Sequence, residues 1–194
     1  GSDHLDVETH VNNTVKDHRL RVLLPSGANA STFIADSAFD VVERPIALRE
    51  DNHEYRELEV ETKPQQSWSA VFDDQRGMAV MAQGLKETAV LDKFERTLAL
   101  TLYRSTHRTA MTAGEPNGQL LMPLTFRYRI APLQGQPDVT HLQHLARRLN
   151  AGTRAVQLRG SELADVESRN LPPTFGLIQS QGPAVVSALH YVGS

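Results

Sequence analysis

Short segments in which apolar and polar residues alternate recur along most of this chain. In the first segment Leu5, Val7 and Val11 fall on one parity, and charged or polar residues fall on the other. A period of two over this length predicts a strand that buries one face. Further strands are predicted at residues 15–24, 33–35, 39–42, 68–72, 78–82, 97–103 and 124–130. This succession of short strands favours an all-β fold.

Two connections in this series have a distinct composition. Asn12 and Asn13 separate the first two runs, and asparagine tolerates the left-handed backbone region that turns require. The two runs are therefore predicted to form a β-hairpin. Residues 49–66 are polar and charged, and their apolar residues do not repeat at helical spacing. This stretch is predicted to be a long surface excursion.

Residues 137–152 break the alternation. Apolar residues recur here three and four positions apart, at Val139, Leu142, Leu145, Ala146 and Leu149. That spacing predicts a short amphipathic helix, with Asp138 as its N-cap. A last apolar stretch includes residues 175–178 and 184–189. About seven to ten strands with one helix predict an antiparallel two-sheet β-sandwich spanning residues 1–194.

Composition and charge argue against several functional classes. The net charge of the 194 residues is −3 with both signs interspersed, whereas nucleic-acid binders usually carry a basic face. No apolar run approaches the roughly 20 residues of a membrane-spanning helix, so we expect a soluble protein. The absence of cysteine excludes disulfides, thiolate zinc sites and cysteine nucleophiles. The bacterial cytoplasm is compatible with this composition and is the expected location.

The sequence offers few residues for catalysis or metal binding. His141 and His144 lie three apart on the predicted helix, a spacing that can chelate a metal but that more often marks a solvated face. The adjacent carboxylates Asp73 and Asp74 fall in a predicted turn, where carboxylates usually stay solvated. Asp36 and Asp40 can bind an ion, but carboxylates in such positions more often cap turns or pair with arginines. We therefore predict no catalytic or metal-binding residue in this chain.

Aromatic residues make up 6% of the chain, too few for an obvious sugar-stacking platform. Tyr55, Trp68 and Tyr103 are candidates for one sugar contact each.

A charged string at residues 16–21 is the most unusual feature. In an alternating strand Asp17, Arg19 and Arg21 share one face. They are either exposed to solvent, or pair with carboxylates on neighbouring strands, or dock another domain, a role that suits the guanidinium fork. The full candidate set for an interdomain or structural polar face is Asp17, Arg19, Arg21, Asp36, Arg44 and Arg104.

Four sequence motifs, which occur in the same order along the chain, resemble those of a known family. Residues 13–22 (NTVKDHRLRV), 35–45 (ADSAFDVVERP), 77–87 (GMAVMAQGLKE) and 98–105 (LALTLYRS) resemble the C-terminal half of the glycoside hydrolase family 38 α-mannosidases. Residues 114–175 fit more loosely. The bacterial type related to mannosylglycerate hydrolase is the most similar, although Thr88 and residues 106–109 depart from its pattern.

The resemblance implies a sandwich of the supersandwich, galactose-mutarotase-like type within a large multidomain enzyme. In that family a separate N-terminal α/β domain carries the zinc, its ligands, the nucleophile and the acid. The catalytic domain is therefore expected to be absent from this chain. No cofactor is expected here, and zinc is implied for the parent enzyme only.

Two functions follow as hypotheses. The first is a non-catalytic β-sandwich domain of an enzyme that hydrolyses α-mannosides, inactive alone, with the catalytic domain as its partner and a possible homo-oligomer as its assembly. The second is a self-standing carbohydrate-binding module. The first also predicts exposed apolar surface where the rest of the enzyme packs.

Overall fold

A computed structural model describes residues 3–108 and 116–152, together with Gln157, Gly182 and Val186. The chain divides into two compact units, residues 1–150 and residues 151–194. The first unit contains every strand of the described residues. Apart from Val186, the apolar segments expected at residues 175–178 and 184–189 lie outside the described residues.

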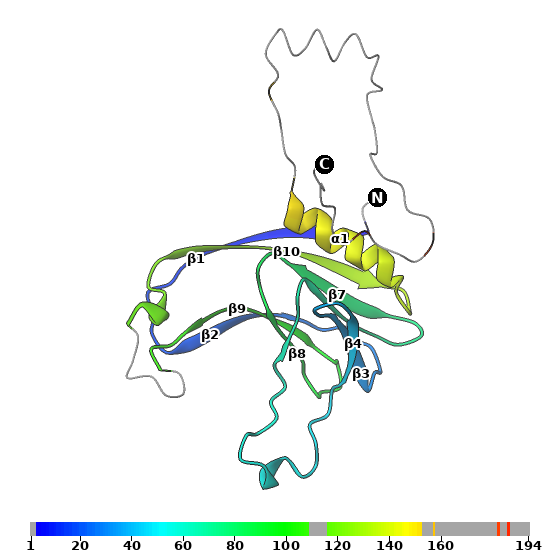
Figure 1. Ribbon diagram of the computed structural model, residues 1–194, viewed down its shortest axis with the longest axis horizontal. Helices are drawn as coiled ribbons and strands as arrows, with labels where there is room; N and C mark the ends of the chain where they lie inside the picture. Colours follow the sequence, from blue (N-terminus) through cyan, green and yellow to red (C-terminus); the bar gives the residue numbers. More distant parts are fainter. Residues whose placement is uncertain (1–2, 109–115, 153–156, 158–181, 183–185, 187–194) are drawn as a thin grey trace, which may run out of the picture. The chain divides into compact units, whose positions relative to one another are not determined.

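Within the described residues, ten strands form two antiparallel sheets (Figure 1). The six-stranded sheet has the order β1 (Leu5–Asn12), β10 (Pro123–Leu133), β7 (Gly77–Ala82), β6 (Trp68–Phe72), β3 (Thr32–Asp36) and β4 (Val41–Pro45). The four-stranded sheet has the order β2 (His18–Leu24), β9 (Leu98–Ser105), β8 (Glu87–Val90) and β5 (Lys63–Pro64). Two 3-10 helices, η1 (Asn52–Glu54) and η2 (Pro116–Gln119), and the α-helix α1 (Val139–Ala151) complete the described elements. The predicted all-β sandwich with one short helix is confirmed.

The main hydrophobic core lies between the two sheets. Its buried side chains come from both of them, among others Phe33, Val71, Val80, Leu98, Leu100 and Tyr128. The alternation predicted for the first strand is confirmed for Val7 and Val11 of β1, which pack against this core, whereas Leu5 is exposed. Burying each such side chain stabilises the fold by roughly 1.5–3 kcal/mol.

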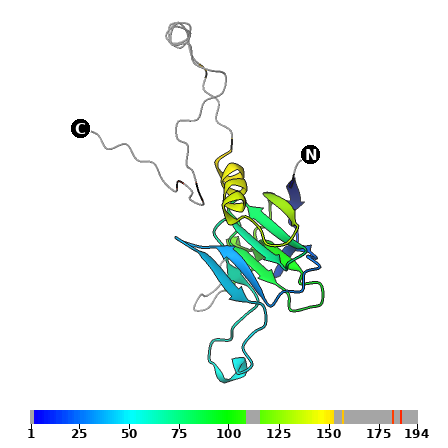
Figure 2. The same cartoon turned by 90° about the vertical axis from the view of Figure 1, so that its right-hand side faces the viewer.

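A second apolar cluster covers the other face of the six-stranded sheet. Helix α1 places Leu142, Leu145 and Ala146 against Trp68 and Met81 of β6 and β7. These strands are therefore buried on both faces, which explains their nearly continuous apolar composition. The Trp68 indole also donates to Oε1 of Gln143 at 2.7 Å. Figure 2 shows α1 and the excursion before β5 on opposite sides of the sandwich.

The predicted hairpin of the first two strands is wrong. β1 pairs with β10 and β2 pairs with β9, so the two strands belong to different sheets. Asn13 is buried and donates from Nδ2 to the carbonyls of Gln119 and Leu120, both at 3.0 Å. These bonds hold the chain where it passes from one sheet to the other. The asparagines do mark a connection, but its direction is set by residues more than a hundred positions away.

Other elements differ from the prediction at their ends. β2 begins at His18, and β4 begins at Val41 because Phe39 lies in the preceding turn with a φ of 71°. β8 was not predicted, since Glu87–Val90 is short and three of its four residues are buried. The excursion at residues 49–66 is confirmed except for the short edge strand β5. Among the described residues no helix has the length and hydropathy to cross a bilayer.

Candidate functional site

The outer side of the four-stranded sheet carries a row of arginines. In β2, Leu20, Val22 and Leu24 pack against the core, so Arg19 and Arg21 point away from it. Arg104 of β9 lies directly opposite Arg19, and Thr101 lies directly opposite Arg21. Residues opposite each other in an antiparallel ladder share a face. We call Arg19, Arg21, Thr101, Arg104 and the neighbouring Glu87 the arginine face.

A register shift brings Arg104 and Thr101 to the same side of β9. Leu20 pairs with Tyr103 and Arg21 with Thr101, so Leu102 has no partner across β2. This bulge reverses the parity of the strand. Without it Arg104 would point into the core.

The arginine face has more cations than anions. Arg104 donates from Nε to both carboxylate oxygens of Glu87 at 2.8 Å. Arg19 donates from Nη1 to the Thr62 hydroxyl at 3.2 Å. Burial, followed by the nearby charges of Arg21 and Arg104, lowers the pKa of Arg19. Among the described residues, Glu87 is the one carboxylate that bonds any of the three guanidinium groups. The face can therefore bind further acidic groups.

Two buried polar atoms on this face make no hydrogen bond within the described residues. They are Nη1 of Arg21 and Oγ1 of Thr101, which occupy paired positions on β2 and β9. Thr101 is only 6% exposed. A buried polar atom without a partner costs about 1–3 kcal/mol. The arginine face therefore offers a donor and an acceptor that the rest of this sandwich leaves unmatched.

The structure places Asp17 away from the arginine face, contrary to the predicted shared face. Asp17 precedes β2, with a φ of 55°, and its carboxylate accepts from Nε2 of Gln119 at 2.8 Å. The Gln119 bond, and then the bond with His107, lowers the pKa of Asp17. The left-handed backbone at this position ends the alternation that the sequence pattern extended through it.

Asp36 and Arg44 belong to the six-stranded sheet and hold local structure together. Asp36 is buried on β3 and accepts from the Ser67 hydroxyl. Arg44 donates from Nη1 to the Pro64 carbonyl at 2.5 Å, and burial lowers its pKa. Because β4 and β5 are the last strands of their sheets, this bond ties two sheet edges together.

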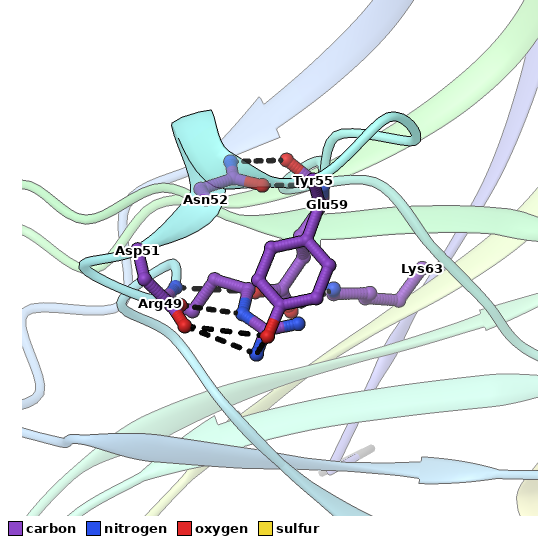
Figure 3. A network of polar contacts seen from close by, with 6 residues as sticks. All are labelled: Arg49, Asp51, Asn52, Tyr55, Glu59 and Lys63. Carbon is purple, nitrogen blue, oxygen red and sulfur yellow. Dashed lines mark hydrogen bonds and ion pairs between the residues drawn. The ribbon is translucent and has the colours of Figure 1, made fainter.

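Residues 47–62, here called the arm, leave the sandwich between β4 and β5 (Figure 1). Figure 3 shows the polar network that braces it. The Arg49 guanidinium lies 3.7 Å from the centre of the Tyr55 ring and donates to Asp51 at 2.8 Å. The Asn52 side chain bonds the backbone of Glu59 twice, at 2.9 and 2.7 Å.

The braced arm is also anchored at its base. Lys63 of β5 donates to Glu59 at 2.5 Å, and Thr62 accepts from Arg19 of the arginine face. Hydrogen bonding from Lys63, and then from the Arg49 backbone, lowers the pKa of Glu59. The arm and the arginine face are therefore contiguous.

The other candidate carboxylates, Asp73, Asp74 and Asp40, lie in the turns between strands. Asp73 accepts the backbone N–H groups of Asn29, Gln75 and Arg76 at 2.7–2.9 Å, and these bonds, in that order, lower its pKa. Asp74 is exposed. Asp40 accepts from the Val41 N–H at 2.7 Å.

Zinc does not fit the residues that the structure describes. His141 and His144 do not converge: His141 bonds Asp3 at 2.6 Å, and His144 is exposed. His4 and then His141 lower the pKa of Asp3 to about 2. The described parts of the chain contain no group of three or more His, Cys, Asp or Glu side chains placed to hold a metal ion.

Two of the three candidate sugar contacts are core residues. Trp68 is fully buried beneath α1, and Tyr103 stacks on Phe126 inside the sandwich. Tyr55 lies on the arm. Sequence reasoning missed Thr101, Glu87 and Thr62, whose significance depends on pairing across strands.

Comparisons with known proteins agree with the fold. Residues 1–111 match the family described as the glycosyl hydrolases family 38 C-terminal domain. An α-mannosidase from Enterococcus faecalis has a similar solved structure, with 31% identity and a TM-score of 0.65, over 75% of this chain and 16% of that chain. A second family 38 structure from Enterococcus faecalis gives 31% identity and a TM-score of 0.60 with the same coverage.

A candidate mannosylglycerate hydrolase of Halalkalibacterium halodurans is 29% identical over 112 residues, which are 54% of this chain and 11% of that protein. The chain thus spans only a small part of the length of the relatives it matches. The family match extends over more than half of this chain and includes both β2 and β9 of the arginine face. The chain therefore belongs to the glycoside hydrolase family 38 C-terminal domain.

Proposed function

We propose that this chain is a non-catalytic β-sandwich region of a family 38 α-mannosidase and supports a zinc-dependent catalytic domain elsewhere in the parent protein. Family membership and the small share of its relatives that the chain spans support this proposal. The observation that carries the supporting role is the arginine face. There, Arg21 and Thr101 each keep a buried polar atom without a partner among the described residues.

Docking of a carboxylate-bearing surface against the arginine face accounts for these atoms. A carboxylate can accept from the Arg21 guanidinium, and a polar neighbour can donate to the Thr101 hydroxyl. Removing both groups from water is favourable only when such partners are present. The parent enzyme is proposed to act on α-mannosides in the bacterial cytoplasm.

The division of labour can be tested by comparing the isolated chain with the longer polypeptide that this proposal requires. The longer polypeptide is expected to hydrolyse an aryl α-mannoside, and a zinc chelator is expected to abolish that activity. The 194-residue chain alone is expected to be inactive. Hydrolysis, or saturable binding of mannosides in calorimetry, by the isolated chain would contradict the proposal.

The supporting role of the arginine face has its own test. Arg21→Met should lower the melting temperature of the longer polypeptide more than that of the isolated chain. Arg127→Met is the matched control, because this exposed β10 arginine bonds Glu8 and lies off the face. Equal losses from Arg21→Met in both proteins would show that Arg21 serves the sandwich alone.

A further inference from the structure

We propose that the arm is a preformed docking element that inserts its apolar side chains into a pocket, rimmed by basic residues, on another domain of the same polypeptide. This inference rests on the proposed function, since it takes the remainder of the parent protein as the occupant. The arm is distinct from the arginine face, although the two meet at Thr62.

The arm combines an internal polar network with exposed apolar side chains. Some of its polar side chains are used internally, in the Arg49, Asp51 and Asn52 bonds of Figure 3. Its apolar side chains face outward. The exposed fractions are 37% for Leu48, 45% for Tyr55, 61% for Leu58 and 57% for Val60. Single exposed apolar residues are ordinary, but four within thirteen positions of one braced segment indicate a contact surface.

Ordering the arm buries little apolar surface in the isolated sandwich. Fixing the backbone of one residue costs about 1–2 kcal/mol in conformational entropy. Leu58 and Val60 belong to neither hydrophobic cluster of the sandwich. A segment that is already ordered loses less conformational entropy when it binds. The internal bonds of the arm therefore favour docking.

The charge of the arm indicates the character of the pocket. Residues 47–62 contain six acidic and two basic side chains, a net charge of −4 with His53 neutral, in a chain of net charge −3. Asp51 and Glu59 are bonded within the arm and its base. Glu50, Glu54 and Glu57 form no ion pair with the described residues and are exposed on the same segment as the apolar side chains. Such a tip is complementary to an apolar pocket with a basic rim.

The length of the relatives indicates where that pocket lies. The similar α-mannosidase structure matches this chain over only 16% of its own length. Most of such a polypeptide therefore lies outside the sandwich and offers surface to the arm. A second copy of this chain is the competing occupant, and the test below separates the two.

Cleavage by trypsin after Arg56 reports whether the arm is covered, because Arg56 is exposed and lies outside the braced network. In the isolated chain we expect ready cleavage. In the longer polypeptide we expect cleavage to slow by about tenfold or more, since the rate follows the population in which the arm is free. Leu58→Ser with Val60→Ser should restore the fast rate.

The matched control is Leu5→Ser with Val15→Ser. These two side chains are each 61% exposed and lie outside the arm, so protection should persist. Neither double variant should change the melting temperature of the isolated chain by more than a few degrees.

Equal cleavage rates in the isolated chain and the longer polypeptide would overturn the inference, as would protection that survives the arm substitutions. Protection of the isolated chain that rises with its concentration would also overturn it, in favour of a second copy. Activity on an aryl α-mannoside is measured separately. An active longer polypeptide with an unprotected arm refutes only this inference, and an inactive one refutes the proposed function whatever the cleavage rate.

Discussion

At the scale of single residues, buried hydroxyl groups distinguish the interior of this sandwich from the arginine face. Ser69 is fully buried, donates to Gln65 at 2.7 Å and lies 2.9 Å from the Thr88 hydroxyl. Thr101 is nearly as buried, but its hydroxyl has no partner among the described residues. The same functional group is therefore stabilising at one position and costly at the other.

This contrast gives a paired prediction. Ser69→Ala should lower the free energy of unfolding by about 1–3 kcal/mol, because Gln65 and Thr88 lose a partner. Thr101→Val should be neutral or stabilise the isolated chain by up to about 1 kcal/mol, because it removes an unmatched polar atom at constant volume. Urea unfolding of both variants measures the difference. A clear loss of stability in Thr101→Val would indicate that its hydroxyl is bonded in solution.

At the scale of elements, α1 covers the outer face of β6 and β7. Leu142 and Leu145 are buried against this sheet, while Val139 of the first turn is 39% exposed. The single tryptophan lies beneath the helix and bonds Gln143. Helix and sheet therefore form one apolar layer whose integrity Trp68 can report.

Leu145→Ala should destabilise the chain by about 2–5 kcal/mol, the usual cost of a cavity at a buried leucine. Val139→Ala, the matched control on the same helix, should cost less than about 1 kcal/mol. Trp68 fluorescence during denaturant unfolding measures both changes. If the two variants unfold at the same denaturant concentration, α1 does not pack as described.

The arm is a second element whose order should depend on pH. Bonding from Lys63 holds the pKa of Glu59 below its ordinary value of 4.5, and bonding from Arg49 holds that of Asp51 below 3.8. A lowered pKa in the folded state stabilises the arm above these ordinary values. The stabilisation is lost as the pH falls through the lowered values. The arm should therefore be braced at pH 7 and loosen in acid.

NMR of the Asn52 side-chain amide and the Tyr55 ring can follow this loosening while the core signals stay unchanged. Glu59→Gln, which keeps the shape but removes the charge, should weaken the bracing at pH 7 and reduce its pH dependence. A pH dependence identical to that of the unaltered chain would show that the Glu59–Lys63 pair does not control the arm.

At the scale of the whole molecule, a few polar side chains connect the two sheets. Asn13 is 4% exposed at the crossing from β1 to β2 and bonds the carbonyls of Gln119 and Leu120. Its Oδ1 also accepts the Val15 N–H at 3.1 Å. At the other end of the sheets Arg44 joins the edges β4 and β5. The Arg44 contact joins strands of the two sheets directly, whereas the Asn13 contact ties the β1–β2 crossing to the connection between β9 and β10, which also passes from one sheet to the other.

Asn13→Ala should therefore lower the stability of the whole sandwich, by about 1–3 kcal/mol, because the carbonyls of Gln119 and Leu120 each lose one of two donors and the Val15 N–H loses its side-chain acceptor. The neighbouring exposed Asn12 provides the control, and Asn12→Ala should change the unfolding free energy by less than about 0.5 kcal/mol. Chemical denaturation measures both. Similar small losses in the two variants would show that the crossing does not depend on the Asn13 side chain.

The residues of the arginine face show how far sequence reasoning extends. Arg19, Arg21 and Arg104 were predicted as members of one polar face, and the structure brings these three together. Thr101 was missed because the bulge at Leu102 reverses the parity of β9. By its parity alone, Arg104 belongs to the face opposite Thr101. A change of register is an event between two strands, so the alternation of one strand does not reveal it.

The sequence alone determined most of the strands, the helix and the family, because hydrophobic period and ordered motifs are local properties that a single chain segment carries. Tertiary structure decided which strands pair, and it placed β1 and β2 in separate sheets although their turn chemistry predicts a hairpin. It also moved Asp17 away from the arginine face and set the arm beside it. Those outcomes depend on contacts between segments far apart in the chain, such as Asn13 with Leu120 and Arg19 with Thr62, which the residue pattern of a single segment does not reveal.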